Sequence, residues 1–284
     1  MAFLGLGAMG APMAANLARA GADVNAWNRT PRRYDALAEL GVKLHSDPEV
    51  AIRDCAFVFL CLLDEHASRE VIGRLLPSLA SDGVVVDHGT IGVVSARDLA
   101  ARVAERGARY LDAPVSGGVR GAAEATLTIM VGGDEDAFGR VRPLLEHLGA
   151  MVEHMGPSGA GQTAKLVNQL LTALHQAAAV EAARLATASG QPLEKLHEVL
   201  RRSYGASAML DRTLPILEAR RFDPSFKMSV LAKDLRLVGE LEADVGVALP
   251  LTESVRALYA EAIESGLGDD DAARLFDFLE GRLL

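Results

Sequence analysis

The start of the chain constrains its fold more than any other segment. It runs Phe3-Leu-Gly-Leu-Gly-Ala-Met-Gly10, so that Gly5, Gly7 and Gly10 follow a short apolar stretch. A helix-like run then continues through Leu17. A strand, a glycine turn and a helix in this order let the backbone approach a pyrophosphate, which the N–H groups and positive dipole end of the helix can bind. The segment therefore predicts a dinucleotide-binding unit.

A second strand follows at the distance that such a unit requires. Gly21 would end the first helix, and 22–27 is the next strand-like stretch. That strand leads into Asn28-Arg29-Thr30, where an NAD site usually carries an acid for the ribose 2′-hydroxyl. Here no acid is present, and Arg29 offers a guanidinium to a 2′-phosphate. We therefore predict NADP rather than NAD; the alternative is an ordinary surface arginine beside an NAD site.

The remainder of the first half alternates strands with helices. Ala56–Cys61 is a continuous apolar run, which is typical of a parallel strand buried on both faces. The further predicted strands are 42–44, 84–87, 109–112 and 127–131, of which the last should close the sheet, and the predicted helices are 32–40, 48–53, 95–106 and 135–148. This rhythm predicts an α/β domain with a mostly parallel, doubly wound sheet of the Rossmann type.

The second half shows helical periodicity and almost no strand signal. A long helix is predicted from about 160 to 189, where Gly190 and Pro192 end it. Shorter helices are predicted at 193–202, 209–218, 229–245 and 252–265, with a last one from about 270. We expect a nucleotide-binding domain over 1–157 and an all-α substrate and oligomerisation domain over 158–284, joined by the long helix.

Composition narrows the class of protein. The chain has 284 residues, of which 50% are hydrophobic and 24% charged, enough for two globular domains. Its net charge of −9 argues against nucleic acid or an anionic membrane as a partner. The longest apolar stretch, 166–188, carries too many polar side chains to span a bilayer. Cys55 and Cys61 lie in or beside an apolar strand, which indicates reduced thiols and a cytoplasmic setting. No metal site is predicted.

Six segments, in order along essentially the whole chain, carry a further pattern. They are Gly5–Met13, Cys61–Asp64, Asp87–Ile91, Asp112–Gly118 with Thr126–Gly133, Gly159–Gln169, and Lys233–Leu235. Together they resemble the β-hydroxyacid dehydrogenase family, the group of 3-hydroxyisobutyrate dehydrogenase, tartronate semialdehyde reductase and the glyoxylate and succinic semialdehyde reductases. The resemblance implies an oxidoreductase that interconverts a small semialdehyde or 2-oxo acid and its hydroxy acid by hydride transfer.

The resemblance also implies roles for individual residues. Lys165 would be the catalytic acid/base. Cofactor contacts would come from Gly5, Leu6, Gly7, Ala8, Met9, Gly10, Asn28, Arg29, Thr30, Leu62, Leu63, Thr90 and Lys233. Substrate contacts would come from Ser116, Gly117, Gly118, Thr90, Asn168, Gln169 and Asp234. Relatives often have Asn where this chain has Gln169, so which of the two neighbouring amides faces the substrate is left open.

Chemistry supports the role of Lys165. Hydride transfer to a carbonyl builds an alkoxide, which needs a proton donor within hydrogen-bond reach. Burial can lower the pKa of a lysine towards neutrality, so that one amine can both give and take this proton. The exposed backbone N–H groups of Gly117 and Gly118, with the Ser116 hydroxyl, suit a small carboxylate.

Three other functions compete with an NADP-preferring reductase. The first is an NAD-dependent 3-hydroxyisobutyrate dehydrogenase. The second is an imine reductase-like enzyme, which usually lacks the lysine found here at Lys165. The third is a non-catalytic nucleotide-binding module, which intact Lys165 and Ser116-Gly-Gly118 disfavour.

The remaining expectations concern partners and two departures from the family pattern. The resemblance implies a small carboxylate substrate and a homodimer or homotetramer, with no nucleic acid or membrane partner. His88 occupies a position where relatives often have a small or apolar residue, and the sequence assigns it no role. Arg120 either makes a second contact to an anionic substrate or is a rim arginine.

Overall fold

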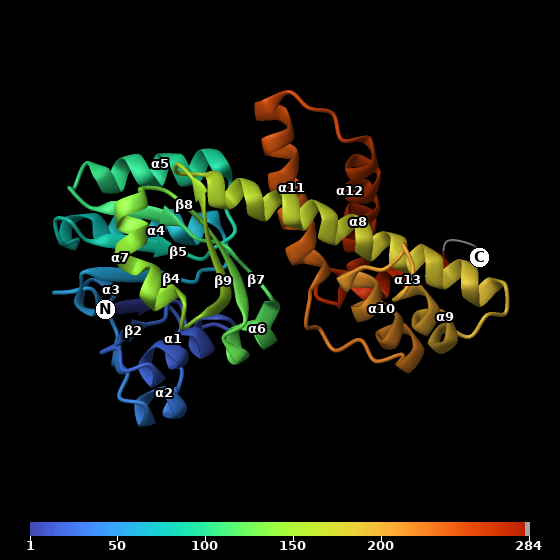
Figure 1. Cartoon of the computed structure of the whole chain (residues 1–284), viewed down its shortest axis with the longest axis horizontal. Coiled ribbons are helices and arrows are strands. Elements are labelled where there is room, and N and C mark those ends of the chain that lie inside the picture. Colours follow the sequence, from blue (N-terminus) through green and yellow to red (C-terminus); the bar gives the residue numbers. More distant parts are fainter. Residues whose placement is uncertain (282–284) are drawn as a thin grey trace. The chain divides into compact units, whose positions relative to one another are not determined.

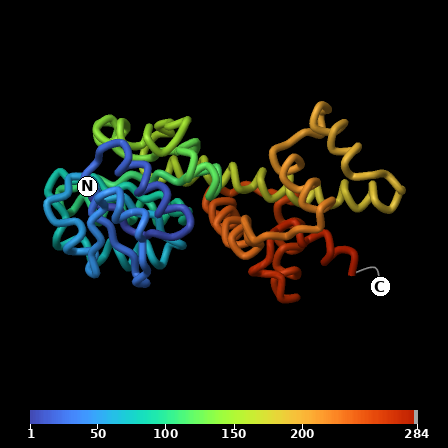
Figure 2. Tube along the Cα trace, turned by 90° about the horizontal axis from the view of Figure 1, so that it is seen from below, coloured from blue at the N-terminus to red at the C-terminus, as the bar shows by residue number. Residues whose placement is uncertain are grey.

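The structure, a computed structural model, describes residues 1–281. The chain packs into two compact units, Met1–Lys165 and Leu166–Leu284. Each unit is continuous in sequence, so the trace runs from blue to green within the first and from yellow to red within the second (Figure 2). The first unit is α/β and the second is helical (Figure 1).

One sheet organises the first unit. Within residues 1–281 it has nine strands, in the order β3-β2-β1-β4-β5-β6-β8-β7, with β9 also paired to β8. The strands are β1 (Ala2–Leu4), β2 (Asn25–Trp27), β3 (Lys43–His45), β4 (Phe57–Leu60), β5 (Val84–Asp87), β6 (Arg109–Asp112), β7 (Val115–Ser116), β8 (Leu127–Gly132) and β9 (Gly149–Gly156). Neighbours from β3 to β6 pair in parallel, whereas β8 is antiparallel to β6 and β7. The predicted Rossmann-type sheet is therefore confirmed.

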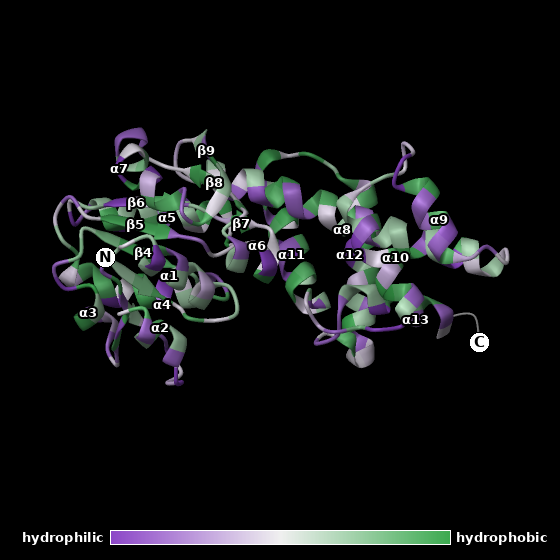
Figure 3. Cartoon of the chain, turned by 60° about the horizontal axis from the view of Figure 1, so that its bottom comes forward, coloured by the Kyte–Doolittle hydropathy of each residue, from purple (hydrophilic) through white to green (hydrophobic). Residues whose placement is uncertain are grey.

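Helices cover both faces of this sheet. They are α1 (Gly10–Arg19), α2 (Asp35–Glu39), α3 (Pro48–Ala51), α4 (Glu65–Leu75), α5 (Val93–Ala104), α6 (Gly118–Glu124) and α7 (Glu135–Leu145). Met13 of α1 and Val141 of α7 belong to one apolar core, and Ile72 of α4 and Leu99 of α5 to another. The central strands contribute to both cores, because successive side chains point to opposite faces, and they are coloured mainly hydrophobic in Figure 3. The sheet is therefore doubly wound.

Strands β7 and β9 and helices α4 and α6 of this unit differ from the expectations. The prediction that 127–131 closes the sheet is wrong, because β9 pairs in parallel with β8. Its sequence carries Glu153 and His154 after only three apolar residues, and Met151 is 55% exposed, so the usual buried-strand signal is missing. Helices α4 and α6 were not predicted from sequence. The Asp64 side chain caps α4 at Ala67 N, 2.9 Å away, whereas α6 follows glycines that resemble a plain turn.

The second unit is built from helices. They are α8 (Ala160–Ala188, which begins in the first unit), α9 (Leu193–Leu200), α10 (Ala208–Ala219), α11 (Met228–Val245), α12 (Pro250–Ala262) and α13 (Leu275–Gly281). Leu214, Leu231 and Tyr259 lie in its apolar core. The observed helices match the predicted ones to within a few residues, because 3.6-residue periodicity and glycine or proline stops are local signals.

No helix in the described part of the chain combines the length and the hydrophobicity that crossing a bilayer requires.

Candidate active site

The three motif glycines play different geometric parts. A Cβ on Gly5, whose φ is +97°, would lie 2.3 Å from the Cys61 carbonyl oxygen, and one on Gly10 would lie 1.9 Å from the Gly5 carbonyl oxygen. Gly5 and Gly10 are therefore required by packing. Within residues 1–281, no atom lies within 4 Å of a Cβ built on Gly7. Gly7 thus leaves open space at the N-terminal end of α1, where a pyrophosphate would approach.

Two side chains outside the motif hold this glycine loop. Leu6 N donates to Asn28 Oδ1 at 2.9 Å, and the Tyr34 hydroxyl donates to the Leu6 carbonyl oxygen at 3.1 Å. Asn28 Nδ2 also donates to the Thr30 carbonyl oxygen at 2.8 Å. The Asn28 amide therefore joins the end of β2 to the loop. Tyr34 was missed because nothing in its local sequence relates it to a residue 28 positions away.

The segment after β2 concentrates positive charge. Arg29, Arg32 and Arg33 are all exposed within one short stretch, although the chain as a whole has a net charge of −9. Arg33 lies 3.4 Å from the Asp35 carboxylate. The end of β2 is therefore locally cationic, as a site for a phosphate at this position requires.

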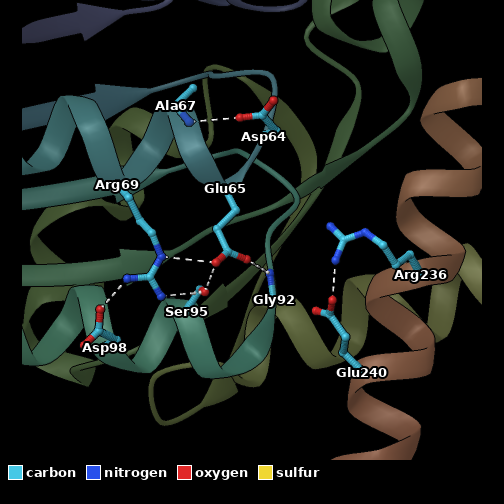
Figure 4. Close-up of polar contacts among 9 residues, drawn as sticks. All are labelled: Asp64, Glu65, Ala67, Arg69, Gly92, Ser95, Asp98, Arg236 and Glu240. Atoms are coloured by element: carbon cyan, nitrogen blue, oxygen red, sulfur yellow. Dashed lines mark hydrogen bonds and ion pairs between the residues drawn. The ribbon is translucent and has the colours of Figure 1, made fainter.

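Two loops follow β4 and β5 at the same edge of the sheet. Leu62 and Leu63 lie in the first loop, where Leu63 is 74% exposed, and Thr90 lies in the second. Glu65 of α4 links the loops, since it accepts hydrogen bonds from Gly92 N at 3.4 Å and from the Ser95 hydroxyl (Figure 4). Burial alone would raise the pKa of Glu65, but the hydrogen bonds from Ser95 and Arg69 hold it below its usual value. Glu65 is thus a fixed carboxylate at the N-terminus of α5.

A second carboxylate caps the helix that carries Lys165. Asp112, at the end of β6, accepts hydrogen bonds from Gly159 N at 2.7 Å and from Gln162 N at 2.8 Å. Burial raises the pKa of Asp112 to about 6. Lys165 follows in the next turn of α8 and is 7% exposed. The first turn of α8 is therefore anchored to the sheet.

Gln162 links that same turn to the loop after β5. Its Oε1 accepts a hydrogen bond from Ile91 N at 3.2 Å, and its Nε2 donates to the Gly89 carbonyl oxygen at 2.8 Å. Gln162 is fully buried. Sequence reasoning missed its role; a long amide side chain among Gly161, Thr163 and Ala164 was the one available signal.

The predicted carboxylate turn lies at the end of β7. Ser116 pairs with Thr128 of β8, and Gly117 and Gly118 have φ values of +130° and +64°. Within the described residues, nothing lies within 4 Å of a Cβ built on Gly118. The turn therefore presents backbone on its open side. Arg120 is 86% exposed and its Nε lies 2.8 Å from Glu124, which favours the rim alternative.

Four predicted residues meet in the second unit. Gln169 Nε2 donates to Asp234 Oδ2 at 2.5 Å, and Asn168 Nδ2 donates to Gln169 Oε1 at 2.9 Å. Lys233 Nζ lies 3.0 Å from Asp234 Oδ1. Gln169 and Asp234 are 4% and 2% exposed. α8 and α11 thus share a polar cluster in which the Asp234 carboxylate and the Gln169 amide are buried and the Lys233 ammonium and the Asn168 amide are half-buried.

His88 joins the ends of two strands. Its Nδ1 lies 2.7 Å from the Ala113 carbonyl oxygen and its ring centroid 5.8 Å from that of Phe59. Because a carbonyl only accepts, Nδ1 carries the proton. Burial lowers the pKa of His88 to about 4, so the ring is neutral near pH 7. His88 therefore ties the end of β5 to the start of the segment that leads to Ser116.

Residues 1–281 contain no group of three or more acidic, histidine or cysteine side chains arranged to hold a metal ion.

Comparisons with known proteins cover nearly the whole chain. The NAD binding domain of 6-phosphogluconate dehydrogenase matches residues 1–156. The NAD-binding domain of NADP-dependent 3-hydroxyisobutyrate dehydrogenase matches residues 159–279.

Individual relatives are similar over their full length. The NAD-dependent L-serine dehydrogenase of Pseudomonas aeruginosa is 36% identical over 99% of both chains. The 2-hydroxy-3-oxopropionate reductase of Escherichia coli is 35% identical over 99% of this chain and 97% of its own. A solved structure of Mycobacterium tuberculosis 3-hydroxyisobutyrate dehydrogenase with L-serine has a TM-score of 0.90 at 34% identity, covering 98% of each chain.

Proposed function

Because this chain belongs to the β-hydroxyacid dehydrogenase family of NAD(P)-dependent oxidoreductases, we propose that it is an NADP-preferring reductase of a small semialdehyde or 2-oxo acid. The reverse activity is oxidation of the corresponding hydroxy acid. The observation that carries this proposal is the anchored first turn of α8, which is bonded through Gln162 to the loop after β5 and to Asp112 and is followed by Lys165.

Lys165 serves as the general acid in reduction and as the general base in oxidation. It belongs to the same compact unit as the glycine loop. Its low exposure of 7% suits a group whose proton must pass to a developing alkoxide rather than to bulk water. When the dinucleotide is bound, it supplies the hydride.

The glycine loop takes the pyrophosphate, with Leu6, Ala8 and Met9 beside the glycines. Open space at Gly7 supports this assignment. Leu62, Leu63 and Thr90 face the nicotinamide end, and Lys233 also contacts the cofactor. Asn28 supports the loop, since its amide binds Leu6 N.

NADP is preferred because the end of β2 is cationic. Arg29 and Thr30 take the 2′-phosphate, with Arg32 and Arg33 adding to the local potential. The relatives themselves divide by name between NAD and NADP, so the cofactor preference of this chain rests on its own arginines.

The substrate is a small carboxylate. Ser116, Gly117 and Gly118 receive the carboxylate through a hydroxyl and backbone N–H groups, as the positive φ values of both glycines support. Asn168, Gln169 and Asp234 add polar contacts. Residues 1–157 form the nucleotide-binding domain, which also supplies the Ser116-Gly-Gly118 turn, and 158–284 form the helical domain for further substrate contacts and for a homodimer or homotetramer.

One panel tests the proposal. NADPH and NADH oxidation would be followed with glyoxylate, 2-hydroxy-3-oxopropionate, succinic semialdehyde and methylmalonate semialdehyde, and NADP⁺ reduction with L-serine and 3-hydroxyisobutyrate. Turnover of one member, faster with the phosphorylated cofactor, supports it. Nucleotide binding with no turnover of any member contradicts it and favours a non-catalytic module.

A further inference from the structure

Gln162 has no part in the proposed chemistry, yet its side chain is fully buried and hydrogen-bonded at both amide atoms. Its amide oxygen and amide nitrogen bind two residues of one loop, Ile91 N at 3.2 Å and the Gly89 carbonyl oxygen at 2.8 Å. A buried amide that satisfies both of its functions on the backbone of a remote segment fixes that segment at two points. Thr90 lies between these two points.

We infer that Gln162 is a positioning residue that holds the loop around Thr90 at a set distance from the turn of α8 that carries Lys165. The inference rests on the proposed function, in which Thr90 lies beside the nicotinamide and Lys165 exchanges the proton. Gln162 touches neither reacting group in this account. It acts by holding the backbone of the loop around Thr90 and the backbone of the α8 turn that leads to Lys165.

The helix side of this link is rigid. The backbone N of Gln162 donates to Asp112 Oδ2 at 2.8 Å, so main chain and side chain of one residue are both bound. The same turn packs tightly on the sheet, because a Cβ on Gly161 would lie 2.4 Å from the Met130 carbonyl oxygen. Lys165 follows Gln162 by three positions, about one helical turn.

The loop side is bound from further directions. Gly89 N donates to Asp87 Oδ1 at 2.8 Å. Gly92 N donates to Glu65 Oε2 at 3.4 Å (Figure 4). These bonds attach the two ends of the loop to its own strand and to α4. The two hydrogen bonds of the Gln162 side chain attach the loop to α8 as well. The amide therefore links the position of the loop to that of the helix.

That spacing matters because hydride and proton must reach one carbonyl group. Rate enhancement by orientation depends on distances of a few ångströms, and a misplacement of about 1 Å costs on the order of a hundredfold in rate. Cofactor affinity depends mainly on the glycine loop and the end of β2, which Gln162 does not contact. Loss of the amide should thus lower kcat and leave cofactor binding intact.

The chain provides a matched control. Gln176 is a second fully buried glutamine on α8, and its Oε1 accepts from the Thr213 hydroxyl at 2.8 Å. Gln162→Met and Gln176→Met remove a buried amide of the same size from the same helix. Gln162→Asn keeps the amide but shortens its reach.

The test compares these variants in three measurements. We expect Gln162→Met to lower kcat by about tenfold or more, with the NADPH Kd within about twofold of the parent. Hydrogen exchange should quicken in peptides covering 89–92 and 159–165, which needs no turnover. Gln162→Asn should also lower kcat, and Gln176→Met should leave kcat and both peptides unchanged.

Each outcome discriminates. Unchanged exchange at 89–92 in Gln162→Met overturns the inference, as does a kcat loss no larger than that of Gln176→Met. If Gln162→Met unfolds, Gln162→Asn gives the same readouts. If Lys165→Ala retains activity while exchange at both peptides still responds to Gln162→Met, the proposed function fails and the link between loop and helix stands.

Discussion

The Asp112 carboxylate accepts a hydrogen bond of 2.8 Å from the backbone N of Gln162. One carboxylate at the end of a strand thereby fixes the helix turn from which Lys165 follows, although burial raises its pKa to about 6. The Gln162 side chain attaches the same turn of α8 to a second segment, because it binds Ile91 N and the Gly89 carbonyl oxygen. The first turn of α8 is therefore held both by the end of β6 and by the loop after β5.

Asp112→Asn should destabilise the protein by about 1–3 kcal/mol, because an amide NH₂ replaces one of two acceptors facing backbone N–H groups. The folded pKa of Asp112, about 6, lies above its ordinary value of 3.8. The folded state therefore binds a proton between these pH values that the unfolded state releases, so Asp112 favours folding more as pH falls from 6 to 4.

Urea unfolding of the parent and of Asp112→Asn at pH 7 and pH 4.5 checks this. The stability difference between them should be larger at pH 4.5. A difference that shrinks on acidification would show that the folded pKa is not raised.

His88 changes the pH dependence of stability in the opposite direction to Asp112. Its folded pKa, about 4, is below its ordinary value of 6.5, so the unfolded state takes up a proton first as pH falls. Its contribution is complete above pH 6.5 and is lost towards pH 4. A pKa difference of this size corresponds to a contribution of about 3 kcal/mol to the free energy of unfolding. In His88→Phe the stability should therefore fall less between pH 7 and pH 4.5 than in the parent, as measured by urea unfolding.

His66 is the control for this experiment, since it is exposed. His66→Phe should follow the parent at every pH. A His88→Phe profile parallel to that of the parent would contradict the assignment.

Lys165→Ala should lower kcat by at least a hundredfold, which is within the usual contribution of a general acid. The NADPH Kd should change little, because the glycine loop and the arginines are untouched. Lys195, which is exposed on α9, provides a control, and Lys195→Ala should retain full activity. Steady-state rates and fluorescence titration separate the two effects. Retention of more than about a hundredth of the parent kcat would remove Lys165 from the mechanism.

Arg29→Asp should move the preference from NADPH towards NADH, because a carboxylate repels a 2′-phosphate and accepts from a 2′-hydroxyl. The ratio of kcat/KM for the two cofactors measures this, with an expected change of at least tenfold. Arg53→Asp, at an exposed position before β4, should leave the ratio unchanged. An unaltered ratio in Arg29→Asp would mean that another group distinguishes the 2′-phosphate from the 2′-hydroxyl.

Gly7→Ala and Gly10→Ala separate binding from folding. A Cβ at Gly7 meets no described atom within 4 Å, so Gly7→Ala should fold with a near-parental Tm but bind NADPH at least tenfold more weakly. A Cβ at Gly10 would lie 1.9 Å from the Gly5 carbonyl oxygen, so Gly10→Ala should lower Tm sharply. Thermal unfolding and NADPH titration distinguish the two. Equal Tm losses would contradict the geometric distinction.

Local pattern was sufficient for much of the fold. The apolar run at 56–61, the glycine loop and the stop at Gly190 each identify an element from neighbouring residues alone, and β4, α1 and α8 follow them closely. Strand β9 was not predicted because it lies at the margin of the sheet and carries exposed residues such as Met151. Its partner β8 supplies the hydrogen bonds that define it, and no local signal reports a partner.

The two-part architecture, the glycine loop and the cationic end of β2 could be predicted from the sequence, since each depends on residues adjacent in the chain. The roles of Gln162, Asn28 and His88 depend on contacts that form only when the chain folds. Gln162 binds residues 71 and 73 positions away, and His88 a carbonyl 25 positions away. A buried polar side chain acquires its role from the partner that folding brings to it. Because burial removes its donors and acceptors from water, each one left unsatisfied is costly, so the fold must place a matching partner beside it.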